Sequence, residues 1–159
     1  KPNEGKVLVD NADIHLNIRG WQKRIGYVSQ SIYLIDDTIK NNIAFGIDPH
    51  KIDNNLIEKV SKDAQILDFI RSLKNGFETK VGERGIKLSG GQIQRIGIAR
   101  ELYLQPELLI FDEATSALDK ETELEFLNCL ESFKNRKTII FVSHRKSALK
   151  NCNKINEID

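Results

Sequence analysis

Two acidic residues, Asp112 and Glu113, directly follow an apolar run at 108–111 that contains no polar residue. Such a run is typical of a strand buried on both faces of a parallel sheet. One carboxylate at the end of this strand can face a Mg²⁺ ion through water, and the next can point to a nucleophilic water. Because phosphoryl transfer requires little beyond positioning and charge stabilisation, the pair indicates phosphate chemistry. Asp112 alone would fit a helix cap equally well.

His144 occupies an equivalent place after a second apolar run, at 139–142. A lone histidine is more often structural than catalytic. At the end of a parallel strand, however, it lies where ligands of such sheets bind, and an imidazole, neutral or cationic, suits contact with a γ-phosphate or an attacking water. Gln30 ends a third strand candidate at 24–29, and its uncharged amide can contact Mg²⁺ or water. Taken alone, this glutamine is ordinary surface material.

The stretch LSGGQIQR at 88–95 places a hydroxyl and two glycines before a helical pattern. Ser89 can cap the helix, and Gly90 and Gly91 let backbone N–H groups approach an anion that the helix dipole favours. A capped helix behind a flexible loop would explain the same residues. No G-x-x-x-x-G-K-[ST] loop occurs in the 159 residues, so the sequence leaves open whose phosphate this stretch would bind.

The elements that position these residues alternate between helix and strand. A helix is predicted over 90–104, ended by Pro106, and the strand at 108–111 follows it. A second helix at 122–134 leads to a fully buried strand at 138–142, which gives a parallel β-α-β unit. The second helix is predicted to place four residues on or near one apolar face: Leu124, Leu127, Leu130 and Phe133.

The region 38–86 changes character, because apolar residues recur there at helical spacing among charged ones. Two or three helices and no strand are predicted for it. The chain is therefore predicted to be α/β and to form one partial domain. Core strands, with short ones at 7–9 and 24–29, and the Gln30 loop occupy 1–37; a helical subdomain occupies 38–86, and the remaining motifs lie in 87–159.

Composition narrows the classes of partner. A net charge of +1, from 24 basic and 23 acidic residues spread along the chain, gives no reason to expect nucleic acid. The two cysteines, Cys129 and Cys152, have no metal-ligand spacing and indicate a reducing compartment, with the thiols as apolar filler. The apolar runs are far shorter than the roughly 20 residues that cross a bilayer.

The order of the motifs is more specific than any one of them. Gln30, a helical insert, LSGGQ at 88–92, LLIFDE at 108–113, SALD at 116–119 and His144 come one after another along the chain. This order resembles the nucleotide-binding domain of ABC transporters, across nearly the whole chain. The resemblance implies a P-loop NTPase-like parallel sheet with the α-helical subdomain of that family inserted, and ATP and Mg²⁺ as ligands.

The resemblance also implies a role for each site residue. Asp112 would hold Mg²⁺, Glu113 would be the general base, and His144 would hold the γ-phosphate and the water. Gln30 would sense Mg²⁺ and the attacking water, and Asp119 would reach the opposite subunit. The signature residues Ser89, Gly90, Gly91 and Gln92 would contact the γ-phosphate of ATP seated on a second ABC domain in a head-to-tail dimer.

Two further stretches resemble the exporter branch of the family: VGERG at 81–85 and YLIDDTIKNNIAFG at 33–46. They imply an exporter or a lipid-oligosaccharide flippase, with a transmembrane domain fused upstream and a place at the cytoplasmic face of the cell membrane.

The Walker A loop of the family is the large departure, because the first residues of the chain resemble the segment that comes after that loop. We expect the chain to be a fragment of a longer ATPase and to be inactive alone. Two alternatives remain at this stage: a non-transport ABC ATPase, and a non-catalytic module that supplies only its signature motif in trans.

Overall fold

A three-stranded parallel sheet forms the centre of the computed structural model, with the strand order β3-β4-β5. The structure describes residues 2–85, 87–115, 118–131, 133, 136–145, 149 and 152–157. The strands are β3 (Ile25–Val28), β4 (Leu108–Asp112) and β5 (Thr138–Val142). Their register pairs Val28 with Phe111 and Phe111 with Phe141, and Asp112 with Val142. The α/β prediction and both predicted strands after Pro106 are confirmed.

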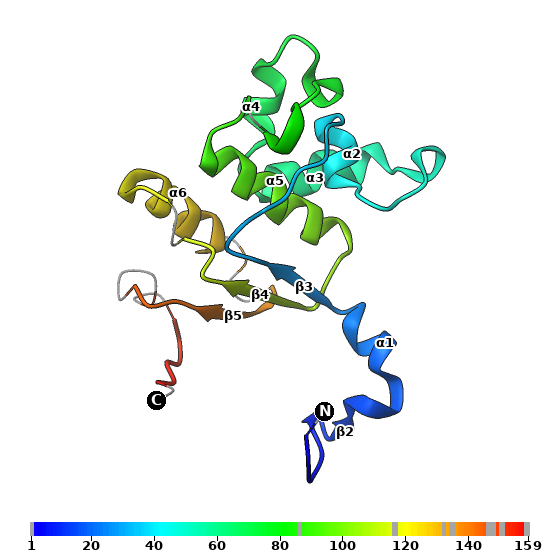
Figure 1. The fold of residues 1–159 in the computed structure, drawn as a ribbon, viewed down its shortest axis with the longest axis vertical. Helices are drawn as coiled ribbons and strands as arrows, with labels where there is room; N and C mark the ends of the chain where they lie inside the picture. The colour runs from blue at the N-terminus through cyan, green and yellow to red at the C-terminus, as the bar shows by residue number, and fades with distance from the viewer. Residues whose placement is uncertain are drawn as a thin grey trace.

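Helices cover one face of this sheet, as Figure 1 shows. They are α5 (Gly90–Tyr103), which precedes β4, and α6 (Lys120–Glu131), which connects β4 to β5. Side chains that point toward them, such as Leu109 and Phe111, are completely buried. Phe111 packs edge-on against Phe126 of α6, with ring centroids 5.6 Å apart. Aromatic packing of this kind contributes beyond the buried area itself.

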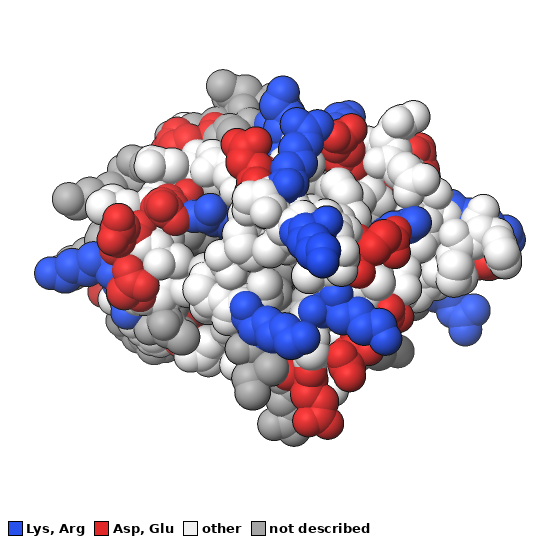
Figure 2. Space-filling model, turned by 90° about the horizontal axis from the view of Figure 1, so that it is seen from above, with Lys and Arg blue, Asp and Glu red and all other residues white. Residues whose placement is uncertain are grey.

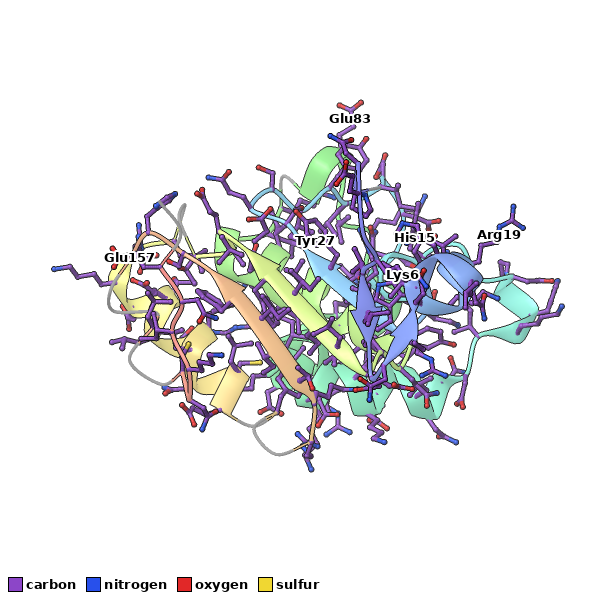
Figure 3. All side chains as sticks on the ribbon, turned by 90° about the horizontal axis from the view of Figure 1, so that it is seen from below. Lys6, His15, Arg19, Tyr27, Glu83 and Glu157 are labelled. Carbon is purple, nitrogen blue, oxygen red and sulfur yellow. The ribbon has the colours of Figure 1, made fainter. Side chains whose placement is uncertain are left out.

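The opposite face of the sheet is open in the described part of the chain. Tyr27, Ile140 and Val142 are exposed to 50%, 46% and 46%. Viewed from that side, the three strands lie in front of the helices, with Tyr27 on the near surface (Figure 3). The expectation that β4 and β5 are buried on both faces is therefore wrong: Ile140 and Val142 of β5 are exposed, and Leu108 and Ile110 of β4 are only half-buried. Apolar side chains fill both faces, as in other parallel sheets, but helices cover only one.

The region 38–86 is helical, as predicted. It contains α2 (Ile39–Ile43), α3 (Asn54–Asp63) and α4 (Leu67–Ser72), with three short 3₁₀ turns, η2 (Pro49–Lys51), η3 (Gly76–Glu78) and η4 (Glu83–Gly85). Its described residues form no strand beyond one isolated bridge, between Thr38 and Lys80. Arg100 of α5 fastens this region to the core: its guanidinium donates to the carbonyl oxygens of Asn42 and Tyr33 at 2.8 and 2.9 Å.

The amino-terminal residues form a hairpin, followed by η1 (Ile14–Asn17) and α1 (Ile18–Gln22). The predicted strand at 7–9 appears as β1 (Leu8–Val9), which pairs antiparallel with β2 (Ala12–Asp13). The turn between them, Asp10 and Asn11, has φ of 49° and 65°. Positive φ at both central residues is the geometry that matches the twist of a two-residue hairpin.

Helix α6 differs from its prediction. It begins at Lys120 rather than 122, and it buries Glu123, Phe126 and Cys129, while Leu124 is 62% exposed. The expected place of Leu124 on the apolar face is therefore wrong. A charged residue replaces it at the core side because Arg145, from beyond β5, donates to the Glu123 carboxylate at 3.0 Å. Burial raises the pKa of the Cys129 thiol to about 12, which fits the predicted filler role.

Charge is mixed over the helical side of the molecule. Figure 2 shows Lys and Arg side chains interspersed with Asp and Glu across this face. Among the described residues, none of the helices has the length and apolar content that a membrane span requires.

Helix α6 allows a matched test of its packing. Phe126→Ala is expected to lower the free energy of unfolding by about 3–5 kcal/mol, because it leaves a cavity beside Phe111. Leu124→Ala, on the same helix but facing solvent, is expected to change it by less than about 0.5 kcal/mol. Urea denaturation measures both. Equal losses from the two variants would contradict the orientation of α6.

Candidate active site at the carboxyl edge of the sheet

The carboxyl ends of β3, β4 and β5 meet at one edge, because the strands are parallel and in register. Gln30 stands two residues beyond β3, Asp112 ends β4, and His144 stands two residues beyond β5. Open parallel sheets bind their ligands at this edge. The sequence therefore predicted correctly that these residues share one edge.

Asp112 turns toward the open face of the sheet. The Tyr27 hydroxyl on β3 donates to its Oδ2 at 2.5 Å, and this bond raises the pKa of the tyrosine. A charge-assisted bond of this length fixes the carboxylate in one orientation. Sequence reasoning missed Tyr27. Its place depends on the strand register, which the sequence does not show: Tyr27 pairs with Ile110, two residues before Asp112 on the same face.

Glu113 turns away from Asp112 and pairs with His144. The imidazole Nε2 lies 3.1 Å from the Glu113 Oε1, and the histidine side chain is 91% exposed. The turn is produced by the Glu113 backbone, whose φ is 49°. This left-handed conformation costs a non-glycine residue of order 1–3 kcal/mol and is commonest at functional sites. The two adjacent carboxylates therefore have different partners: Tyr27 for Asp112 and His144 for Glu113.

The loops that carry Asp119 and His144 are tied together. Arg145 Nη1 donates to the Leu118 carbonyl oxygen at 3.2 Å and to Glu123 on α6. Asp119 caps α6: it accepts the N–H groups of Glu121 and Thr122 at 3.0 Å each. The bonds from Thr122 lower the pKa of Asp119. Ser116 and Ala117, the first half of the SALD motif, lie outside the described residues.

The signature residues form a complete capping box at the start of α5. Ser89 Oγ accepts the Gln92 N–H at 3.3 Å, and the Gln92 side-chain oxygen accepts the Ser89 N–H at 2.9 Å. Two of the first N–H groups of the helix are thus satisfied reciprocally. The capping box does not use the N–H groups of Gly90 and Gly91, which lie at the positive end of a 14-residue helix.

The two signature glycines have different surroundings. A Cβ on Gly91 would lie 2.4 Å from Thr122 Cγ2, so close packing of α5 against α6 explains this glycine. A Cβ on Gly90 would meet nothing within 4 Å. Packing within the chain therefore does not require glycine at position 90. Access of a ligand to the Gly90 backbone is the remaining explanation for this glycine.

The metal ligands predicted from the sequence fit Mg²⁺ only if phosphates and water complete its ligand set. Mg²⁺ is usually held by one or two carboxylates together with substrate phosphates and water. In the described ranges, no group of three or more His, Cys, Asp or Glu side chains is arranged to hold a metal. Asp112, oriented by Tyr27, supplies one oxygen ligand of the right kind, and Gln30 lies at the same edge.

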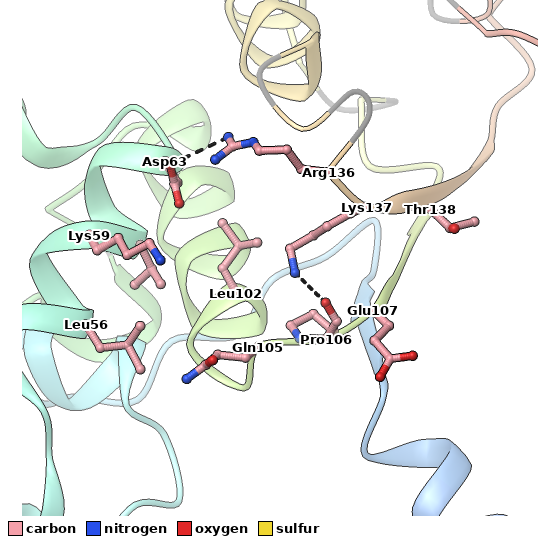
Figure 4. Close-up of a pocket in the computed structure, with 11 residues that line it drawn as sticks. Leu56, Lys59, Asp63, Leu102, Gln105, Pro106, Glu107, Arg136, Lys137 and Thr138 are labelled. Atoms are coloured by element: carbon pink, nitrogen blue, oxygen red, sulfur yellow. Dashed lines mark hydrogen bonds and ion pairs between the residues drawn. The ribbon is translucent and has the colours of Figure 1, made fainter.

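A hollow lies at the opposite, amino ends of β4 and β5. This cavity of about 600 Å³ is open to solvent, and Figure 4 shows its lining. Two of its basic groups are engaged by the protein: Lys137 Nζ donates to the Pro106 carbonyl oxygen, and Arg136 lies 3.7 Å from Asp63. Burial lowers the pKa of Lys137. The hollow is a seam between α3 and the sheet, remote from the carboxylate edge.

A parallel sheet with helices on one face and polar groups at its carboxyl edge is the architecture of P-loop NTPase-like folds. The sequence matches the ABC transporter family over residues 1–116. The chain belongs to this family.

Its relatives are exporters and flippases. The chain is 40% identical over 156 residues to an ATP-dependent lipid A-core flippase of Cupriavidus metallidurans, covering 97% of the chain and 26% of the relative. It is 42% identical over 159 residues to an ATM1-type heavy metal exporter of Novosphingobium aromaticivorans, covering 99% and 26%. A solved bacterial Atm1-family ABC exporter with ATP bound superposes with a TM-score of 0.80 at 42% identity, over 94% of the chain and 26% of that structure. The chain thus spans about a quarter of these relatives.

The glycine environments give a direct test. Gly91→Ala is expected to lower the free energy of unfolding by about 1–3 kcal/mol, because its Cβ displaces Thr122 from the Asp119 cap. Gly90→Ala, one residue earlier, is expected to leave it unchanged within about 0.5 kcal/mol. Denaturation of the two variants side by side measures the difference. A large loss for Gly90→Ala would show that packing, rather than access, requires that glycine.

Proposed function

We propose that the chain is the ATP-hydrolysing part of an ABC exporter, which couples ATP binding and hydrolysis to transport across a membrane. The observation that carries the proposal is the contact of Glu113 with His144, 3.1 Å apart, beside the oriented carboxylate of Asp112. The family match and the exporter names of the relatives support it.

The geometry supports a division of labour among these residues. Glu113, turned out of the sheet, accepts a hydrogen bond from the attacking water and polarises it. His144, highly exposed beside it, keeps the Glu113 carboxylate in place through Nε2 and stands where it can contact the γ-phosphate. Asp112 and Gln30 would hold the Mg²⁺ ion, and the chemistry that the bound ion would supply is neutralisation of phosphate charge. The side chains therefore do the positioning on which phosphoryl transfer depends.

The signature residues are proposed to serve a second ABC domain. Ser89, Gly90, Gly91 and Gln92 would contact the γ-phosphate of ATP held by that domain in a head-to-tail dimer. The open space at Gly90 supports this role, since a backbone N–H at a helix start binds anions when nothing covers it. Asp119, at the start of α6, would approach the same partner.

The rest of the proposal concerns the longer protein. The chain would be the fragment of an ATPase domain divided as 1–37, 38–86 and 87–159, with a transmembrane domain fused upstream, at the cytoplasmic face of the membrane. The relatives are named for different cargoes, lipid A-core and heavy metals, which is consistent with selection of cargo outside these 159 residues.

Glu113→Gln tests the proposed base in the full-length protein. The variant keeps the size of the side chain and removes its charge, so turnover of ATP with Mg²⁺ is expected to fall by ~10²–10⁴-fold, while ATP still binds. Phosphate release and nucleotide binding are measured in parallel.

Two controls sharpen the outcome. Glu107→Gln alters an exposed acid at the other end of β4 and is expected to leave turnover unchanged. The 159-residue chain alone is expected to show no hydrolysis, because its sequence has no G-x-x-x-x-G-K-[ST] loop. A wild-type rate in Glu113→Gln, or Glu113-dependent turnover by the chain alone, would refute the respective claim. ATP turnover in a full-length protein without transmembrane helices would favour a non-transport ATPase.

A further inference from the structure

Gln94, the seventh residue of LSGGQIQR, has no part in the proposed chemistry and is nevertheless buried. Its side chain lies in α5 and only 4% of the residue is exposed. The amide Nε2 donates to the Ala114 carbonyl oxygen at 2.6 Å. Ala114 directly follows Glu113, and it is buried as well. A buried amide in a helix thus reaches across 20 residues of sequence to the turn that presents the carboxylate.

This turn needs support, because Glu113 holds a left-handed backbone conformation with φ of 49°. Such a conformation persists only where the surrounding structure over-determines it. On its first side, the Glu113 N–H donates to the Val142 carbonyl oxygen of β5 at 3.0 Å. On the other side, the Gln94 amide donates to the carbonyl oxygen of Ala114, the next residue. Two hydrogen bonds, from β5 and from α5, therefore flank the strained residue.

The geometry points to Gln94 as a positioning residue that holds the Glu113 carboxylate in its productive place beside His144. This inference rests on the proposed function, in which Glu113 polarises the attacking water. Gln94 lies on the same helix as the signature residues, five residues after the Ser89 cap. The helix that would grip a phosphate on a partner domain therefore also sets the carboxylate of its own chain.

A positioning role has a kinetic signature that a merely structural role lacks. Without the amide donor, the turn at 113–114 can relax, and a displacement of about 1 Å at a reacting group can cost on the order of 10²-fold in rate. Only 4% of Gln94 is exposed, so its side chain offers no surface for a bound nucleotide. Loss of its bond is therefore expected to lower kcat and to leave KM for ATP unchanged.

The test uses the full-length protein and compares Gln94→Met with Ser61→Ala. Gln94→Met keeps the length of the side chain and removes its donor. Ser61→Ala is the matched control, since Ser61 also gives one buried hydrogen bond to a carbonyl, that of Ile57 in α3, within the helical region. Gln94→Met is expected to lower kcat at least about tenfold, through the displacement effect above. Ser61→Ala is expected to keep the wild-type kcat.

A double-mutant cycle with Glu113→Gln identifies the route of the effect. If Gln94 acts through Glu113, Gln94→Met lowers turnover in the wild-type background and adds nothing in the Glu113→Gln background. Equal losses in both backgrounds, a raised KM with unchanged kcat, or wild-type kinetics of Gln94→Met would overturn the inference. Should Gln94→Met fail to fold, Gln94→Asn, which keeps the amide but shortens its reach by one methylene, is judged by the same criteria.

The inference and the proposed function fail in different ways. Wild-type protein without Glu113-dependent ATP hydrolysis would refute the proposed function and, with it, the role of Gln94. Wild-type hydrolysis that depends on Glu113 but not on Gln94 would refute the inference alone.

Discussion

The parallel, in-register pairing of β3, β4 and β5 is the constraint on which the rest of the structure depends. Because the three strands run the same way, each must be connected to the next by a helical crossover, and their carboxyl ends must coincide. The first condition places α5 and α6 on one face of the sheet. The second brings Gln30, Asp112, Glu113 and His144 to one edge, although the first and the last of them are more than a hundred residues apart in the sequence.

The edge becomes a site through a few hydrogen bonds that give its groups different directions. Tyr27 holds Asp112 on the open face, while the left-handed turn at Glu113 points the next carboxylate toward His144. Bonds from the Arg145 guanidinium join the histidine loop to the turn before α6. Each of these contacts joins residues that are distant in the sequence, so the site depends on the packing of the sheet and the helices beside it.

The sequence predicted the strands at 108–111 and 138–142 and the helix ending before Pro106, because long apolar runs and a proline are strong local signals. It also predicted which residues share the edge, since parallel topology alone decides that. Leu124 was placed wrongly because the partner that lets Glu123 face the core, Arg145, lies 22 residues away in the sequence. The spacing of apolar residues within one helix cannot reveal a partner that lies elsewhere in the sequence.

The supporting residues of the site were not predictable for the same reason. Tyr27 depends on the register of β3 against β4, and the bond of Gln94 depends on how α5 crosses the turn after β4. A pattern such as LSGGQIQR marks a helix start, but it does not show that its seventh residue faces inward. The openness of one sheet face, too, depends on the elements that cover the sheet and not on the apolar strands themselves.

A structure of the full-length Glu113→Gln protein with ATP and Mg²⁺ tests the composite site most directly. We predict a γ-phosphate that lies between two sets of groups. The substituted side chain and His144 of one copy would stand on one side, and the signature residues Gly90 and Gly91 of a second copy or partner domain on the other. A γ-phosphate bound by Gly90 and by His144 of the same copy, or placed away from the carboxyl edge of β4, would contradict this arrangement.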